Sequence, residues 1–131
     1  MERYEKKKYL RGYQNAIINL KRLEEEYETV YTEATKIVPT LTGMPSSNVK
    51  DDKMAKYAAK LAEIQARIDN ARNKIARIDA ELAHLKPYHR TIIELVDVKG
   101  YPVSAVARKL NITEHGVRVK RNRIIDKMFL Q

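Results

Sequence analysis

The feature that most constrains this chain is a run of apolar residues spaced alternately three and four apart over more than four heptads. The run consists of Met54, Tyr57, Leu61, Ile64, Ile68, Ala71, Ile75, Ile78, Leu82 and Leu85. This spacing places a single apolar seam along the whole length of a helix. Another helix has to cover that seam, and the pattern alone leaves open whether it comes from the same chain or from a second copy.

The beginning of the chain supplies a helix of comparable length. From about residue 2 to residue 38 the sequence contains no proline and one glycine, Gly12, and its apolar residues again recur at steps of three and four. Pro39 is predicted to end this helix, because a proline inside a helix removes a backbone hydrogen bond. The two long helices are therefore expected to form a helical hairpin.

A loop is predicted between these helices, at about residues 39–52. It gathers prolines, a glycine, serines and an asparagine, which favour turns over helix interiors. Asp51 or Asp52 is the expected N-cap of the second long helix. At about a dozen residues, the loop is long for a helical hairpin.

The composition agrees with an all-α fold. Charged residues make up 33% of the chain, whereas Gly and Pro contribute only 4 residues each, a balance typical of long solvated helices. We predict a long, coiled-coil-like helical hairpin over residues 1–86 and a small helix-turn-helix domain over residues 87–131. The absence of cysteine excludes a disulfide framework. The charged N-terminus and the lack of a long apolar run predict a cytoplasmic protein with no membrane contact.

The net charge of +9 indicates an anionic partner. The excess of basic over acidic residues rises from +1 in residues 1–38 (8 against 7) to +3 in residues 39–86 (9 against 6). It reaches +5 in residues 87–131 (9 against 4). The C-terminal domain is therefore the expected site of contact.

The C-terminal domain begins where Pro87 interrupts the second long helix. Residues 88–98 are predicted to form a short helix, and residues 99–101 a turn. Pro102 is expected at the first position of a new helix, Val103 to Leu110, since that position needs no N–H donor. Asn111 tolerates the left-handed backbone of a tight turn, and Thr113 is the expected N-cap of a helix over residues 114–129.

The packing positions fit two helices crossing at a tight turn. The small residue at the crossing is Ala107, and the predicted apolar wedge consists of Val106, Leu110, Ile112, Val117, Ile124 and Met128. The remaining faces of the last helix are polar and basic. Such a helix suits the DNA major groove, with residues near its start reaching base edges and later cations meeting phosphates.

The residues of this region resemble a known family pattern. The segment GYPVSAVARKLNITEHGVRVKRNRIIDKM resembles region 4 of the sigma-70 family, although Ser104 and Ala105 replace its usual acidic residues. The chain as a whole is similar to small phage and prophage transcriptional regulators of Gram-positive bacteria, the late-operon activators of the RinA and ArpU kind. The candidate DNA-binding residues, from the resemblance and from the basic group on the last helix, are Thr113, Glu114, His115, Gly116, Arg118, Val119, Lys120, Arg121, Asn122 and Arg123.

The sequence lacks the residue patterns that the common kinds of catalysis require. We therefore predict no enzyme, no cofactor and no catalytic residue. There is no glycine-rich phosphate loop, no cysteine nucleophile and no pair of carboxylates in an apolar setting. His84 and His89 are five residues apart around Pro87, which does not place both on one helical face, and no metal site is expected.

Three functional hypotheses follow from these patterns. The first is a sequence-specific DNA-binding regulator of phage late genes, in which the hairpin forms a homodimer or contacts host RNA polymerase. The second is a small terminase-like subunit that recognises DNA for a phage packaging motor, which would assemble into a ring. The third is a coiled-coil protein with a non-specific basic tail.

Overall fold

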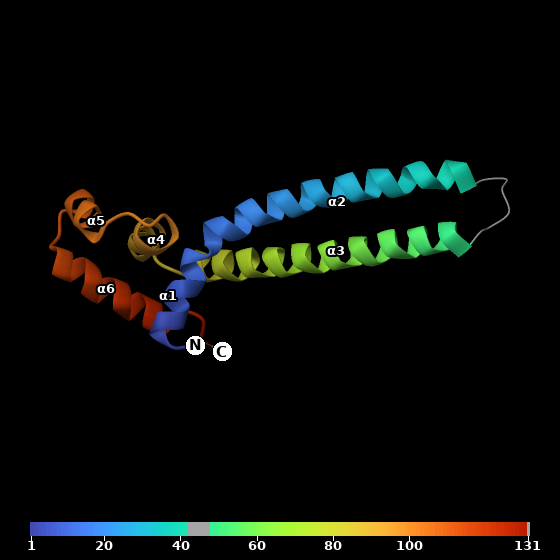
Figure 1. Cartoon of the computed structure of the whole chain (residues 1–131). Coiled ribbons are helices and arrows are strands. Elements are labelled where there is room, and N and C mark those ends of the chain that lie inside the picture. Colours follow the sequence, from blue (N-terminus) through green and yellow to red (C-terminus); the bar gives the residue numbers. More distant parts are fainter. Residues whose placement is uncertain (42–47, 131) are drawn as a thin grey trace. The chain divides into compact units, whose positions relative to one another are not determined.

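The computed structural model describes residues 1–41 and 48–130. All regular secondary structure in these residues is helical, which confirms the predicted all-α fold (Figure 1). The helices are α1 (Arg3–Arg11), α2 (Tyr13–Leu41), α3 (Asn48–Ala83), α4 (Pro87–Ile93), the π-helical turn η1 (Glu94–Val98), α5 (Val103–Leu110) and α6 (Glu114–Lys127). Within the described residues, no helix combines the length and the apolar character needed to cross a membrane.

Two compact units share the chain. The hairpin unit is Ile18–Asn73, and the core unit combines Met1–Ile17 with Lys74–Gln131. The sequence analysis placed a boundary near Pro87, whereas the core unit also takes in the first 17 residues and the last part of α3. The physical reason is that Leu10, Ile78 and Leu82 are buried in its apolar core.

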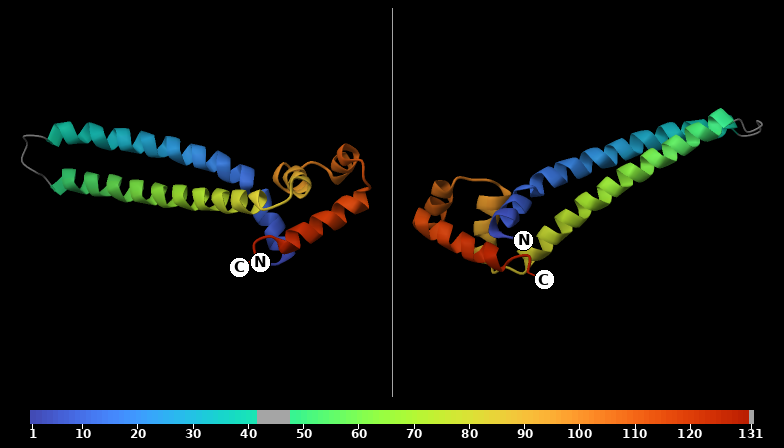
Figure 2. Two further views of the ribbon diagram at one scale, coloured as in Figure 1. Left: turned by 180° about the vertical axis from the view of Figure 1, so that it is seen from behind. Right: turned by 60° about the horizontal axis from the view of Figure 1, so that its bottom comes forward.

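The hairpin unit pairs α2 with α3 within one chain. The two helices lie side by side in both views of Figure 2. Val30 of α2 and Ile64 and Ile68 of α3 are buried at their contact. The partly buried apolar residues around them are Leu20, Leu23, Tyr27, Tyr57 and Leu61. In this unit, the seam of α3 is therefore covered by α2 of the same chain.

The predicted N-terminal helix is not continuous. It divides at Gly12, whose N–H is shared between the carbonyl oxygens of Lys8 and Tyr9 at 3.3 and 3.2 Å. A side chain at position 12 would collide with the ammonium group of Lys74. The glycine thus gives Lys74 room to approach the backbone, and the prediction of one uninterrupted helix was wrong.

The helices also extend beyond the predicted loop boundaries. α2 continues past Pro39 to Leu41, and α3 begins at Asn48. A proline removes its own backbone hydrogen bond and crowds the carbonyl four residues before it, but the residues just after it keep their own N–H donors. Asp51 and Asp52 therefore lie inside α3 instead of capping it. The rest of the predicted loop, residues 42–47, lies outside the described residues.

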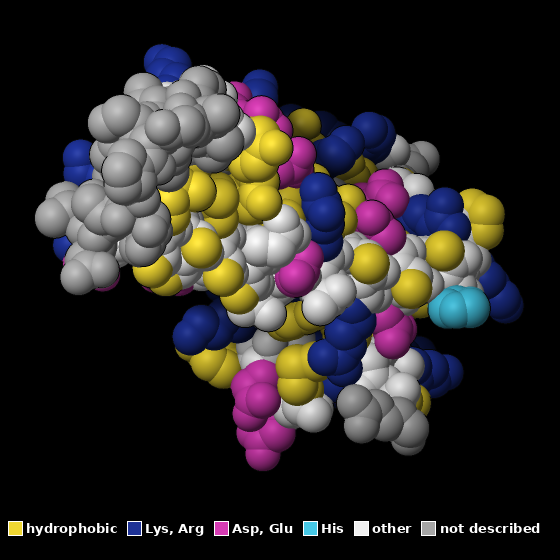
Figure 3. All heavy atoms as spheres, turned by 90° about the vertical axis from the view of Figure 1, so that its right-hand side faces the viewer, with side chains coloured by type: hydrophobic (Ala, Val, Ile, Leu, Met, Phe, Trp, Pro, Cys, Tyr) yellow, Lys and Arg dark blue, Asp and Glu magenta, His cyan; other side chains and the backbone are white. Residues whose placement is uncertain are grey.

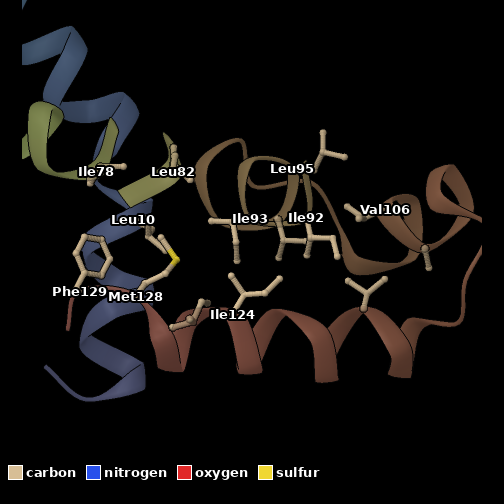
Figure 4. Close-up of a cluster of buried hydrophobic side chains, with 14 residues drawn as sticks. Leu10, Ile78, Leu82, Ile92, Ile93, Leu95, Val106, Ile124, Met128 and Phe129 are labelled. Carbon is tan, nitrogen blue, oxygen red and sulfur yellow. The ribbon is translucent and has the colours of Figure 1, made fainter. Parts of the chain in front are cut away.

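In the core unit, α1, α4 and α5 each pack against α6. Figure 4 shows Ile92 and Ile93 of α4 pointing toward α6, and Met128 and Phe129 lying near Leu10 of α1. The buried residues of this core are Leu10, Ile78, Leu82, Ile92, Ile93, Leu95, Val96, Val106, Ala107, Val117, Ile124, Ile125, Met128 and Phe129. The helix predicted over residues 88–98 is present, but its second half is the π-helical turn η1.

Helix α1 holds the C-terminal end of α6. The Arg3 guanidinium donates to both carboxylate oxygens of Asp126 at 2.8 and 2.6 Å. The buried Lys6 ammonium donates to the backbone carbonyl of Asp126 at 3.1 Å. A cation here satisfies a helix-terminal carbonyl and complements the negative end of the helix dipole. The edge of Tyr9 against Phe129, with ring centroids 5.3 Å apart, completes the contact.

Candidate nucleic-acid interface

The turn between α5 and α6 has the geometry of a helix-turn-helix. Asn111 takes the left-handed conformation (φ 62°, ψ 40°), as predicted, and ends α5. The hydroxyl of Thr113 accepts a hydrogen bond from the Gly116 N–H at 2.9 Å, which confirms the predicted N-cap of α6. Helix α5 spans Val103–Leu110 as predicted, with Pro102 as its N-cap instead of its first helical residue. Gly100 has a positive φ of 75°.

Gly116 lies close against this cap. A Cβ atom at position 116 would come 3.1 Å from the hydroxyl oxygen of Thr113, which is tighter than an ordinary contact. A glycine at position 116 therefore leaves room for the capping hydroxyl.

The predicted apolar wedge is buried between the helices. Val106 and Ala107 of α5 meet Val117 of α6, and Ile124 and Met128 continue the same stripe. Leu110 and Ile112 pack at its edge. Burying a side chain of this size stabilises the fold by about 1.5–3 kcal/mol, so the wedge fixes how α6 lies against α5.

The surface of α6 divides into three stripes that follow the helical repeat. The buried stripe contains Val117, Arg121, Ile124 and Ile125. The second stripe, called here the reading face, contains His115, Arg118, Val119 and Asn122. The third, called here the cationic stripe, contains Lys120, Arg123 and Lys127. His115 and Arg118 are exposed, as are all three residues of the cationic stripe.

Arg121 has a different environment from its neighbours. The sequence analysis placed it among the DNA-binding residues, but its guanidinium forms a bidentate ion pair with Asp97 of η1, with distances of 3.0 Å from Nε to Oδ2 and 2.5 Å from Nη2 to Oδ1. The side chains are 12% and 0% exposed. Buried charges are tolerated only when paired in this way, so we assign Arg121 to positioning α6 and leave it out of the interface.

The sequence did contain a signal for this pair. Position 121 is four residues after Val117 and three before Ile124, so the helical repeat puts it on the buried stripe. Asp97 stands between two valines in a helix whose other residues are largely apolar. Two opposite charges on predicted buried positions indicate an internal ion pair.

The remaining predicted residues lie at or near the surface of α6. Thr113, Glu114 and His115 are exposed at its N-terminal end, and Gly116 and Val119 are partly exposed. Asn122 is also partly exposed, but its carbonyl oxygen is buried and makes no hydrogen bond with the described residues. Turning this amide toward a ligand would therefore not break a protein hydrogen bond at that oxygen.

Basic residues are not confined to α6. Lys7 of α1 lies near Arg121, and its pKa is lowered by partial burial and by the positive charge of that arginine. Figure 3 shows basic and acidic side chains interspersed over the face it displays. Net positive charge alone therefore does not mark the binding surface. The arrangement of polar and basic side chains on α6 is the better guide. In the described part of the chain, no three His, Asp or Glu residues gather as a metal site.

Comparison with known proteins supports this geometry. Residues 75–128 match the family model of sigma-70, region 4. The match runs from the last part of α3 through α6 and includes both helices of the motif. Searches of the curated proteins and of the solved structures found no match. The core unit thus contains a sigma-70 region-4-like helix-turn-helix, which is a DNA-binding and non-catalytic domain of transcription proteins.

Proposed function

We propose that this protein is a sequence-specific transcription regulator that binds duplex DNA by inserting α6 into the major groove. The observation that carries the proposal is the division of α6 into three stripes. The buried stripe fixes the helix on the core unit, and the reading face carries polar groups near its exposed N-terminal end. Side chains in that position reach base edges in helix-turn-helix complexes.

Within the reading face, Arg118 and Asn122 have the chemistry for base recognition. An arginine donates two hydrogen bonds to guanine, and an asparagine amide pairs with adenine. The unpaired carbonyl oxygen of Asn122 favours this role, because binding would give it a hydrogen bond that it lacks. His115 of the reading face and its neighbour Glu114 lie exposed at the start of the helix, beside these residues.

The biological setting is also part of the proposal. The resemblance of the sequence to late-operon activators supports a phage or prophage regulator acting at late genes. The hairpin unit would bind a second copy of the chain or host RNA polymerase. Tyr31 and Ile18, which are exposed on α2, are apolar side chains that such a partner would cover.

Selection of bound duplexes from a random DNA library, combined with light scattering on the same sample, tests the proposal. We expect one enriched motif and a monomer or dimer. A twofold repeat in the motif would add dimerisation. A ring-sized particle would favour the packaging subunit, and the absence of any enriched motif would exclude sequence-specific regulation.

A pair of variants tests the assignment of the stripes. Arg118→Ala should weaken binding to the selected site by about 1–3 kcal/mol and change binding to unrelated DNA much less. Lys120→Ala, which removes a phosphate contact, should weaken both alike. Competition binding against labelled duplexes measures both losses, and equal behaviour of the two variants would remove Arg118 from the reading face.

A further inference from the structure

A groove beside the cationic stripe has an unusual charge distribution. It has a volume of about 510 Å³ and lies between α6 and residues 84–89, which link α3 to α4 and form the start of α4. It is lined by two apolar residues, Leu85 and Ile124, and by six basic ones. The basic residues are His84, Lys86, His89, Lys120, Arg123 and Lys127. We call it the basic groove.

The lining of the basic groove contains no acidic residue among those that the structure describes. A second groove of the core unit, of about 440 Å³, differs in this respect, because Asp79 and Glu94 accompany Arg90 and Lys99 in its lining. The three lysines and the arginine of the basic groove form no ion pair with a described residue. Lys120 instead lies 5.0 Å from the centre of the Tyr88 ring. Their charges are therefore available to an external anion.

The position of the basic groove identifies the anion. Its wall on α6 is the cationic stripe, which runs along one flank of the proposed reading helix. A helix in the major groove has a sugar–phosphate strand along each flank, because the groove is only about 12 Å wide. The opposite wall, with Lys86 and the two histidines, places more donors beside the same flank.

We propose that the basic groove binds the phosphodiester backbone of duplex DNA along one flank of α6, and that Lys86 and Lys127 are phosphate-binding residues. The proposal rests on the proposed function for the placement of α6 in the major groove. It extends the interface beyond the helix-turn-helix to the segment between α3 and α4. Such contacts would set the position of the protein on DNA and contribute affinity without reading sequence.

The test uses the full chain with Lys86→Gln/Lys127→Gln. Both side chains are exposed, so the double variant should keep the fold, which circular dichroism verifies. The matched control is Lys53→Gln/Lys60→Gln, which makes the same charge change at exposed positions in the hairpin unit. Dissociation constants are measured over a range of salt concentrations for the selected duplex and for an unrelated duplex of equal length.

We expect the groove variant to reduce the slope of log K against log salt by about 2, since each phosphate contact contributes about 0.9. With equal binding at about 1 M salt, this corresponds to roughly 60-fold weaker binding at 0.1 M for both duplexes. A slope and affinity equal to those of the control would overturn the assignment of the basic groove to phosphate binding. The preference for the selected duplex would be unaffected.

The two proposals can fail separately. If the wild type shows no preference between duplexes but the groove variant still loses affinity and slope, the groove assignment holds and sequence-specific regulation is excluded. If the wild type binds neither duplex, both proposals are overturned.

Discussion

The two ends of α6 are held by contacts that differ greatly in sequence separation. At the N-terminal end, Thr113 caps the first turn, and Asn111 closes the turn that precedes it. At the C-terminal end, Arg3 and Lys6 bind Asp126 across 123 and 120 residues. The proposed DNA-reading end is thus encoded locally, whereas the anchored end depends on a helix from the other end of the sequence.

Among the variants that test this difference between the two ends, Leu10→Ala is expected to have the largest effect on stability. Leu10 is 0% exposed and packs in the core beside the C-terminal end of α6. Removing its side chain should lower the free energy of unfolding by about 2–5 kcal/mol through lost burial and a residual cavity. Urea denaturation measures the loss. The control Ile17→Ala, at a residue 44% exposed, should change stability by less than about 1 kcal/mol.

A loss for Leu10→Ala no larger than that of the control would mean that α1 is dispensable to the core unit. The difference drawn between the two ends of α6 would then be wrong, since α1 would contribute nothing measurable to stability.

Thr113→Ala probes the local end and should have a smaller effect. Losing the hydroxyl that accepts the Gly116 N–H is expected to cost about 1 kcal/mol. Hydrogen exchange should show faster opening in the first turn of α6 and unchanged protection near Asp126. Thr113→Asn keeps a capping side chain and should restore protection, and an equal loss in this variant would argue against capping as the cause.

The smallest effect is expected from the exposed pair of Arg3 and Asp126, whose side chains are 48% and 47% exposed. Hydrogen bonds from Arg3 lower the pKa of Asp126 below its ordinary value of 3.8. Because the folded pKa is the lower one, the stabilisation is present above about pH 4 and is lost as the pH falls through the folded pKa.

Urea midpoints of the wild type and of Asp126→Asn, measured from neutral to acidic pH, test this pair. The difference between them should shrink on acidification and also in high salt. A difference that is independent of pH would show that Lys6 and the apolar contacts carry the whole anchor.

What the sequence predicts well are features whose causes are local. The backbone preference of Asn111, the capping hydroxyl of Thr113 and the spacing of Val117 and Ile124 each act within one or two turns of helix. Together they predict the helix-turn-helix and its buried wedge, and the structure confirms both.

What the sequence analysis missed depends on pairing between distant segments. Arg121 was predicted to be a surface cation. In the structure it pairs with Asp97, which lies 24 residues away in the sequence. The close approach of Lys74 to Gly12 and the contact of α1 with Asp126 likewise join residues that are far apart in the sequence. Helical periodicity says which side of a helix is buried but not which helix covers it.

The contact between α1 and α6 also has a consequence for protein synthesis. α1 leaves the ribosome long before its partners in α6, so the contact of Tyr9 with Phe129 forms only after more than a hundred further residues have been added. The core unit therefore completes its fold only after α6 has been synthesised, and contacts this distant in sequence slow folding. A chain whose translation stops early would leave α1 uncovered and open to chaperones and proteases.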